Sequence, residues 1–379
     1  MNRSERIMRE LCELAGVELN TNAPDAILVK SPDFYTRVLA NGSLSVGETY
    51  MDGLWDCARL DSALTKFMRL HDSDINKFLA EHPLYLLYNF FAHLKAKLLN
   101  LQSIVRAGIV GEKHYDLGND LYERMLDSRM QYTCAYWKKA KNLEQAQEAK
   151  LELICRKLGL KPGMRLLDIG CGWGGLLRYA AECYGVSGVG ITISKQQRAY
   201  AKDICAGFDI EIRLQDYREL NERFDRIASI GMLEHVGVKN YPTYMRAVAK
   251  LLKDEESLFL LQTIGNNISL QKGNAWLNKY IFPNGMLPSM RQIIAAAEGR
   301  LIIEDWHSFG PDYDKTLMSW YANFTGSWQE IADRYSTRFY RMWEFYLLSC
   351  AANFRARKTQ LWQLVCSSHG LPGGYTPIR

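Results

Sequence analysis

Hydrophobic and polar positions follow two alternating spacings from about residue 143 onward. Segments with helical spacing, such as "LEQAQEAKLELICRKLGL", are followed by short apolar runs, such as "MRLLDIG" and "SLFLLQTIG". Helical segments that alternate with short buried strands are typical of βαβ units. The pattern therefore predicts an α/β fold with a doubly wound, mostly parallel sheet that helices cover on both faces.

The segments on either side of this region have other patterns. The first part of the chain combines a helix with short extended stretches, such as "SLSVGETYMDGLW", and predicts a small α+β domain over residues 1–73. Apolar residues at helical spacing predict a helical linker over 74–110, either a helix between domains or one that rests on a membrane or lines an acyl path. Residues 111–379 would form the main domain, with further helices notably over 328–365.

The composition is that of an ordinary soluble globular protein, with 47% hydrophobic and 23% charged residues among 379. That length agrees with about two domains. The net charge of +5 is too small for a dedicated nucleic-acid-binding protein, so we expect no nucleic-acid partner. Nine cysteines without a CxxC pair favour neither a metal site nor a disulfide framework, and indicate a reducing cytosol.

A glycine-rich turn, "LLDIGCGWGG", follows the first strand of the alternating region. Glycines at such a turn let the backbone approach a ligand, and the next helix offers free N–H groups. Gly170, Gly172 and Gly175 satisfy GxGxxG, but the second strand, "GVGITIS", lacks the terminal carboxylate that a nicotinamide cofactor requires. Asp168 instead begins the pattern D-x-G-x-G-x-G, which is typical of S-adenosylmethionine (SAM) methyltransferases. We therefore predict SAM, with a nicotinamide cofactor as the alternative.

Four stretches together resemble one methyltransferase family. They are "HYDLGNDLYERMLDSRMQYTCAYW" at 114–137, "LLDIGCGWGG" at 166–175, "GMLEHVG" at 231–237 and "NKYIFPNG" at 278–285. An unrelated methyltransferase would share only the second. Over most of its length the chain is similar to the cyclopropane fatty acid synthases and their relatives, the mycolic acid cyclopropane synthases.

This resemblance implies a reaction on membrane lipid. In such enzymes the SAM methyl carbon is transferred to the cis double bond of an unsaturated acyl chain in a phospholipid. A carbocation results, a bound bicarbonate removes a proton, and a cyclopropane ring closes. The resemblance therefore implies SAM and bicarbonate as cofactors and an unsaturated phospholipid as the substrate.

The resemblance also implies roles for four residues around the bicarbonate and for one further cysteine. The backbone amide of Cys134 would face it, Glu234 would be its carboxylate partner, and Tyr313 would be a hydroxyl donor. Ile264 would supply a backbone contact, and Cys350 matches a cysteine suspected of activity in the family.

The expected SAM contacts surround the glycine-rich turn. Asp168 can meet the cationic amino group, while the end of a later strand, "LQD", offers hydrogen-bonding groups near an adenine. The full set is Tyr132, Thr133, Asp168, Gly170, Gly172, Gly174, Thr192, Ile193, Ser194, Gln197, Gln215, Asp216 and Tyr217.

Gln262 departs from the family pattern. The strand before "TIG" usually ends in a histidine that hydrogen-bonds the bicarbonate, and here the residue is Gln262. An amide can donate to an oxyanion but cannot carry a proton. The alternative product is therefore a methyl- or methylene-branched acyl chain, formed when the same cation loses a different proton or gains hydride.

Several of these residues have a second interpretation. Three roles are open for Glu234: it could orient the bicarbonate, accept the proton itself or cap the start of a helix. His235 is adjacent, but successive residues at a strand end point in opposite directions, so the two are not expected to share a pocket. Cys350 lies among apolar neighbours and could be structural, whereas Tyr313 lies in a Gly/Pro/Asp loop with little core to join, which favours a function.

Aromatic residues are candidates for shielding the cation from water. A cation over an aromatic face in a desolvated pocket gains about 1–2 kcal/mol. The candidates are Tyr132, Tyr136, Trp137, Tyr280 and Phe282, each of which could instead be an ordinary core residue.

The expected setting is the cytoplasm, peripheral at the inner membrane, with a homodimer and with residues 1–73 associated with lipid. A different class of function is a lipid-binding regulator that has lost catalysis. The intact "DIGCGWGG" and Glu234 argue against that alternative.

Overall fold

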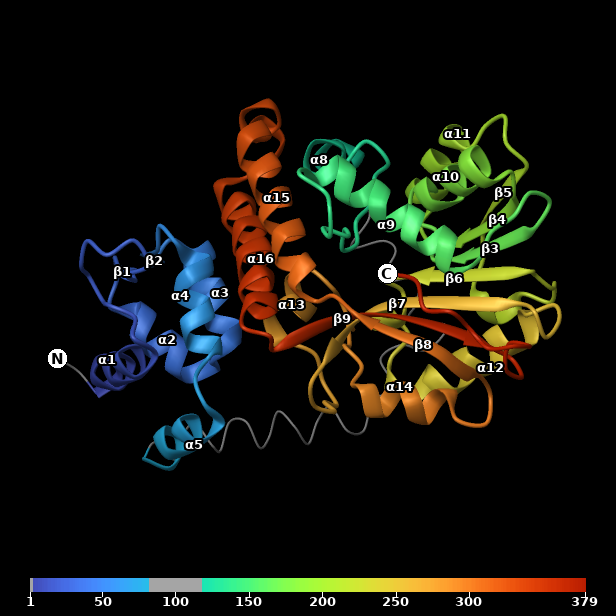
Figure 1. The fold of residues 1–379 in the computed structure, drawn as a ribbon. Coiled ribbons are helices and arrows are strands. Elements are labelled where there is room, and N and C mark those ends of the chain that lie inside the picture. The colour runs from blue at the N-terminus through green and yellow to red at the C-terminus, as the bar shows by residue number, and fades with distance from the viewer. Residues whose placement is uncertain (1–2, 82–117) are drawn as a thin grey trace.

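The computed structural model describes residues 3–81 and 118–379, and its ribbon is drawn in Figure 1. Most of the predicted linker over 74–110 lies outside the described residues. Its first residues belong to helix α5 (Asp72–Glu81). Within the described part of the chain, no helix is long and apolar enough to cross a membrane.

A seven-stranded sheet with strand order β5-β4-β3-β6-β7-β9-β8 forms the centre of the main domain. The first five strands in this order pair in parallel, whereas β9 pairs antiparallel with both β7 and β8. The sheet is therefore mostly parallel, as predicted. The strands are β3 (Arg165–Ile169), β4 (Ser187–Thr192), β5 (Ile210–Leu214), β6 (Arg226–Ile230), β7 (Leu258–Asn266), β8 (Ile302–Ser308) and β9 (Thr359–Ser367).

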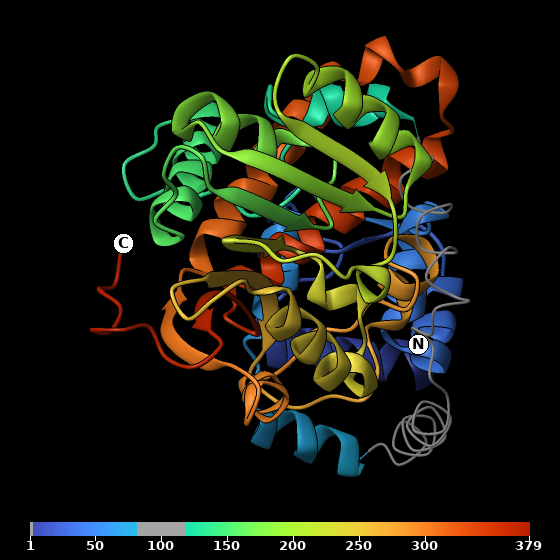
Figure 2. The same ribbon diagram turned by 90° about the vertical axis from the view of Figure 1, so that its right-hand side faces the viewer.

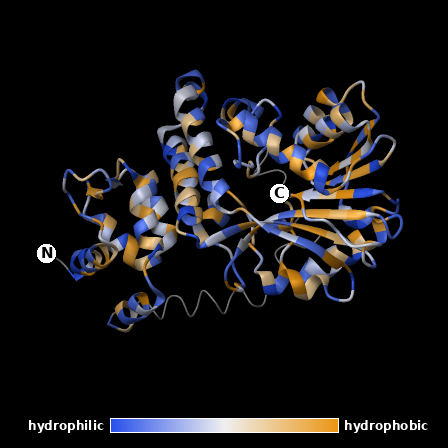
Figure 3. Cartoon of the chain, viewed as in Figure 1, coloured by the Kyte–Doolittle hydropathy of each residue, from blue (hydrophilic) through white to orange (hydrophobic). Residues whose placement is uncertain are grey.

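Helices cover both faces of this sheet (Figures 1 and 2). Alternate side chains of the strands enter separate cores, and hydrophobic residues gather on the central strands (Figure 3). One core contains α9 (Leu143–Lys157), α10 (Gly175–Tyr184) and α11 (Lys195–Ile204). The other contains α12 (Tyr241–Leu251) and α14 (Met290–Ala297). This arrangement confirms the doubly wound prediction.

Polar residues define where these helices begin. The side chain of Asn142 accepts from the N–H of Gln145 at the start of α9, and Ser289 with Gln292 forms a capping box at the start of α14. Such caps satisfy N–H groups that have no partner inside the helix.

A further core joins the N-terminal elements to two long helices of the main domain. Its members come from α15 (Pro311–Ser327), α16 (Thr337–Arg355) and the N-terminal helices. The N-terminal elements are α1 (Arg3–Ala15), β1 (Leu28–Val29), α2 (Asp33–Asn41), α3 (Ser43–Met51), β2 (Trp55–Asp56) and α4 (Leu60–Met68). Helices α8 (Asn119–Met125) and α13 (Ala275–Tyr280) also contribute residues to this core.

The stretch "SLSVGETYMDGLW", which was predicted to be extended, is mostly helical. It forms α3 and only then the short strand β2. Gly47 of α3 faces Trp276 of α13, because a Cβ at Gly47 would come within 2.3 Å of the indole nitrogen. Packing of the helix against α13 therefore overrides the local preference for a strand.

The prediction that residues 328–365 are helical is also wrong for the last part of this range. Helix α16 ends at Arg355, Arg357 has a φ of 61°, and the chain returns as β9 between β7 and β8. Every residue of β9 is buried. Its sequence, "TQLWQLVCS", is buried on both faces and does not alternate polar with apolar residues, so no period of two distinguishes this strand from a helix.

Candidate active site

The glycine-rich turn opens into a cavity at the carboxyl ends of β3, β4, β5 and β6. Gly170 and Gly172 have φ values of 83° and 54°, which glycine adopts without steric cost. Most of the expected cofactor contacts line this cavity, namely Tyr132, Thr133, Asp168, Gly170, Gly172, Thr192, Ile193, Gln197, Gln215, Asp216 and Tyr217.

The cavity lining does not include Gly174 and Ser194, which lie at the starts of the two adjacent helices. Gly174 precedes α10, and a Cβ there would come within 3.1 Å of both Ala201 and Cys205 of the α11 region. Ser194 caps α11 by accepting from the N–H of Gln197 at 3.2 Å. Both residues therefore shape the site through helix packing.

Asp168 presents a buried acceptor to the cavity. Its side chain is 3% exposed, and its Oδ1 atom has no hydrogen-bond partner. Burial raises the pKa of this carboxyl to about 7, while the positive charge of Lys150 opposes the increase. A buried carboxyl group with an unused oxygen, beside a glycine turn, fits the cationic amino group of SAM.

Asp216 has a different environment at the far end of the cavity. Its carboxylate accepts from both Nε and Nη2 of Arg218, at 2.7 and 2.6 Å. Despite burial, which raises it, the pKa of Asp216 is lowered overall by its hydrogen bonds to Arg218. This carboxylate is therefore neutralised by an arginine and remains ionised.

Glu234 lies in a short 3-10 turn, η2 (Leu233–His235), directly after β6. Its Oε1 atom accepts from the backbone N–H of Ile264 at 2.7 Å, while its Oε2 atom is buried without a partner. Burial raises the pKa of this carboxyl to about 7, although the Ile264 N–H and the Thr263 hydroxyl lower it. The side chain bonds to β7 and not to the start of a helix, so the capping interpretation has no support.

His235 faces the cofactor cavity. It is part of the cavity lining, its ring lies 6.0 Å from that of Phe282, and its Nδ1 atom has no partner. Burial lowers the pKa of His235 to about 4, so the imidazole is neutral. The two adjacent side chains have different surroundings, as predicted, although the cause is a 3-10 turn and not a strand end.

Gln262 is a buried member of β7 and is 1% exposed. Its Oε1 atom accepts from Nε2 of Gln363 on β9 at 2.8 Å. This bond leaves Nε2 of Gln262 as the group that can donate. The Oε1 atom of Gln363 has no partner.

Cys134 and Tyr313 are connected through α15. The Cys134 thiol is fully buried and lies 4.0 Å from the hydroxyl of Thr316, three residues after Tyr313. Burial holds the pKa of this thiol well above its usual value, so it is not a nucleophile at neutral pH.

The expected loop around Tyr313 is instead the first turn of α15. The Tyr313 ring is buried against Phe354 at 4.5 Å and Trp320 at 6.0 Å. The expectation that this tyrosine has little core to join is therefore wrong, because α16 folds back over the start of α15.

Tyr132, Phe282 and Tyr346 form an aromatic cluster next to the cavity. The hydroxyl of Tyr132 donates to that of Tyr346 at 2.9 Å, and the rings of Phe282 and Tyr346 are 5.7 Å apart. Cys350 lies one helical turn after Tyr346 on α16, and burial raises the pKa of its thiol to about 12. The thiol is therefore protonated at neutral pH.

The other three aromatic candidates have separate surroundings. Tyr136 packs against His307 and Phe309, at 5.9 and 5.4 Å between ring centres. The indole N–H of Trp137 donates to Thr316 at 3.0 Å. The hydroxyl of Tyr280 donates to Glu48 of α3 at 2.8 Å.

Two buried polar residues of α9 were not identified from the sequence. Lys150 donates to Gln131 Oε1 at 2.6 Å and to Thr133 Oγ1 at 3.0 Å, and Gln147 donates to the backbone oxygens of both residues. A signal was available, because both occupy positions on the buried face of a helix where an apolar residue is expected.

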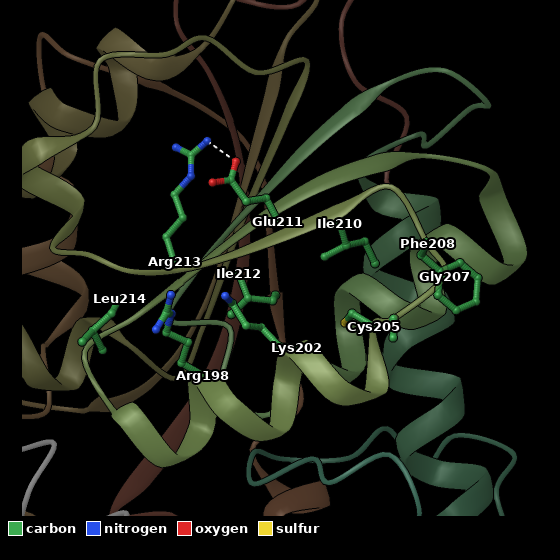
Figure 4. A pocket seen from close by; sticks show the side chains of 11 residues that line it. Arg198, Lys202, Cys205, Gly207, Phe208, Ile210, Glu211, Ile212, Arg213 and Leu214 are labelled. Carbon is green, nitrogen blue, oxygen red and sulfur yellow. Dashed lines mark hydrogen bonds and ion pairs between the residues drawn. The ribbon is translucent and has the colours of Figure 1, made fainter.

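A second groove lies between α11 and the edge strand β5 (Figure 4). It is lined by Arg198 and Lys202 of the helix and by residues 210–214 of the strand. As the structure describes it, its lining shares no residue with the predicted site. Among residues 3–81 and 118–379, no group of three His, Cys, Asp or Glu side chains could hold a metal ion.

Comparison with known proteins gives consistent results. A family model described as mycolic acid cyclopropane synthetase matches residues 103–364. The cyclopropane-fatty-acyl-phospholipid synthase of Escherichia coli (strain K12) is 56% identical over 374 residues, which cover 99% of this chain and 96% of that protein. A probable fatty acid methyltransferase of Pseudomonas putida is 35% identical and covers 66% of this chain and 67% of its own length.

Solved structures of cyclopropane synthases have the same fold. MmaA2 from Mycobacterium tuberculosis has a TM-score of 0.65 and 30% identity, covering 71% of this chain and 100% of that chain. The mycolic acid cyclopropane synthase CmaA1, complexed with SAH and CTAB, has a TM-score of 0.64 and 32% identity, covering 69% and 98%.

Proposed function

Because the chain belongs to the mycolic acid cyclopropane synthetase family, we propose that it transfers the SAM methyl carbon to the cis double bond of unsaturated acyl chains in membrane phospholipids, forming a cyclopropane ring. The observation that carries this proposal is the buried carboxyl group of Glu234 with an unused oxygen. Glu234 is not itself part of the cofactor-cavity lining, but the next residue in the chain, His235, is, which supports a base close to the methyl donor's site.

Three features of the cavity support SAM as the cofactor. Asp168 offers an unpartnered oxygen to an ammonium group, and a Cβ at Gly172 would meet nothing within 4 Å, so the turn has room for a ligand. Gln215 and Asp216, directly after β5, line the cavity and offer hydrogen-bonding groups for an adenine. When bound, SAM supplies an electrophilic methyl group.

The aromatic cluster has two tasks in this mechanism. Tyr132, Phe282 and Tyr346 keep water from the reacting carbon atoms, and their ring faces stabilise positive charge on the acyl chain by about 1–2 kcal/mol. The protonated thiols of Cys134 and Cys350 add polarisable walls without a nucleophile that could trap the cation.

The final step removes a proton, and we propose that bicarbonate bound beside Glu234 supplies the base. Glu234 Oε2 and the Nε2 group of Gln262 offer an acceptor and a donor for such an anion. The N–H of Ile264 already donates to Glu234, so this residue would act mainly by orienting the carboxylate. Cys134 and Tyr313 are the further proposed contacts.

The product structure tests the main proposal. Purified enzyme, SAM and vesicles of unsaturated phospholipid should yield acyl chains that are fourteen mass units heavier, with the proton signals of a cyclopropane ring. A new olefin or a methyl branch would instead support the alternative product that Gln262 suggests. No release of S-adenosylhomocysteine would support a lipid-binding regulator.

The role of bicarbonate has its own test. Carefully degassed enzyme should lose most of its rate and recover it when bicarbonate is added. If the degassed enzyme keeps its full rate, Glu234 itself is the base, since its pKa of about 7 allows it to accept a proton.

We also propose that the enzyme acts peripherally at the inner membrane surface as a homodimer. The support is indirect: the proposed substrate is a membrane lipid and the net charge is +5. Flotation with anionic vesicles and sedimentation in solution test the two parts separately.

A further inference from the structure

Lys150 is a buried charge directly behind the cofactor cavity. Its side chain is 0% exposed, and it belongs to the middle of α9. Lys150 itself is not part of the cavity lining, but both of its hydrogen-bond acceptors, Gln131 and Thr133, are. Burying an ammonium group is unfavourable unless partners compensate for the lost water, so this position requires an explanation.

The residues that Lys150 holds belong to an irregular segment that forms one wall of the cavity. Residues 130–133 all line the cavity, and Met130 has a φ of 56°, which is unfavourable for a residue other than glycine. Gln147 of α9 donates to the backbone oxygens of Gln131 and Thr133, at 3.2 and 2.9 Å. Helix α9 therefore supports this wall with side chains, since no strand pairing is present there.

Lys150 also faces the acidic groups around the cavity. Asp168 on β3 and Asp127 on the loop after α8 are each 3% exposed. Burial raises the pKa of both carboxyl groups, and the charge of Lys150 opposes the increase. The Cys134 thiol is the other titratable group that acts on it. The ammonium thus compensates two buried carboxyl groups without entering the cavity, where it would repel a cationic ligand.

We propose that Lys150 is a positioning residue of the cofactor site, which fixes Gln131 and Thr133 in the cavity wall and compensates the buried Asp168 that faces the ammonium group of SAM. This inference rests on the proposed SAM-dependent function. It assigns α9, which carries none of the predicted contacts, a direct part in cofactor affinity.

The test compares two substitutions on the same helix. Lys150→Met removes the charge and both hydrogen bonds at nearly equal size. Lys157→Met is the matched control, because Lys157 is also 0% exposed but lies near His307, at 3.1 Å, outside the cavity lining. SAM affinity is measured by calorimetry for the wild type and for both variants, together with their thermal unfolding.

We expect Lys150→Met to weaken SAM binding by about tenfold or more, since it leaves Gln131 and Asp168 without a compensating partner. Lys157→Met should bind SAM within about twofold of the wild type, although it also unfolds at a lower temperature. Unchanged affinity in Lys150→Met, or equal losses in both variants, would overturn the proposal. A wild type that binds no SAM would instead contradict the proposed function.

A pH series gives a readout that a purely structural role would not change. Burial lowers the pKa of Lys150 to about 8, against the effects of Asp127, Cys134 and Asp168. Wild-type affinity for SAM should therefore fall as the pH rises through 8, and the fall should be absent from Lys150→Met. The amino group of SAM titrates in both experiments, so only the difference between the two curves counts. Parallel curves would contradict the assigned role.

Discussion

In the proposed mechanism, Glu234 is the residue on which the chemistry depends most directly. One oxygen of its buried carboxyl group accepts from the N–H of Ile264, and the other has no partner. Glu234→Gln should lower the rate of product formation by about 10²- to 10⁴-fold, because the amide can neither charge a bound anion nor accept a proton. The matched control is Glu152→Gln on α9, where Glu152 accepts from Tyr179 and Tyr184. That variant should keep its rate.

Asp168 and Glu234 also make stability depend on pH. Burial raises their pKa values from 3.8 and 4.5 to about 7 in the folded protein. The folded state therefore binds these protons more tightly than the unfolded state, so the stabilisation is complete below pH 3.8 and is lost as the pH rises through 7.

Thermal unfolding of the ligand-free protein between pH 5 and 8 measures this effect. The unfolding temperature of the wild type should fall over that range relative to that of Asp168→Asn. Only this difference counts, because burial lowers the pKa values of His235, His307 and Lys157, which changes stability in the opposite direction in both proteins. SAM should reduce the relative fall, since its cation compensates the ionised Asp168. A difference between the two proteins that stays constant from pH 5 to 8 would contradict the assignment.

The Gln262–Gln363 pair has a structural role, and Gln262 also has the proposed chemical one. Gln262→Leu should destabilise the fold by about 1–3 kcal/mol, because it leaves the buried amide of Gln363 without its acceptor. In urea unfolding, the double variant Gln262→Leu/Gln363→Leu should lose less free energy of unfolding than the sum of the two single variants.

The activity of Gln262 variants is a separate test. Gln262→His should match or exceed the wild-type rate. If Gln262→Ala and Gln262→His both leave the rate and its bicarbonate dependence unchanged, Gln262 is only a structural residue.

At the scale of elements, α3 and α13 are in such close contact that position 47 of α3 has no room for a side chain. Gly47→Ala should destabilise the protein by about 1–3 kcal/mol, since its Cβ would overlap the indole of Trp276. Gly326→Ala in α15 is the control, because nothing lies within 4 Å of its Cβ. That change should be neutral or stabilise by about 0.5–1 kcal/mol. Denaturant unfolding of the two variants separates these outcomes.

Helix α16 connects the N-terminal elements with the candidate site. Its Glu344 accepts from the hydroxyls of Tyr50 on α3 and Tyr321 on α15, at 2.6 and 2.9 Å. Two residues further along the same helix, the hydroxyl of Tyr346 accepts from that of Tyr132, which lines the cavity. The position of the aromatic cluster therefore depends on packing that includes the N-terminal helices.

For the whole molecule, this shared core predicts how stability is distributed. The N-terminal helices and α15–α16 belong to one hydrophobic cluster, whereas α9–α12 pack on the sheet. In hydrogen exchange, Gly47→Ala should therefore increase exchange in α4 and α16 together and leave α10 and α12 nearly unchanged. Faster exchange confined to α3 would show that residues 1–73 open independently.

The sequence by itself determined the elements whose signals are local. The glycine turn with Asp168, the alternation of helices and parallel strands, and the family motifs are each contained in short stretches, where propensity and spacing act directly. These signals were sufficient to predict the fold class, and most of the predicted cofactor contacts line the cofactor cavity.

Only the tertiary structure decided the contacts between distant segments. Local patterns do not show that β9 enters the sheet, that Tyr313 is buried under α16, or that Gln262 is paired with Gln363. Lys150 is hidden for the same reason, since its acceptors lie 17 and 19 residues earlier in the chain. Sequence patterns indicate which residues can be buried, whereas the tertiary structure decides which buried groups contact one another. The protonation states and reactivity of the residues in this site depend on those contacts.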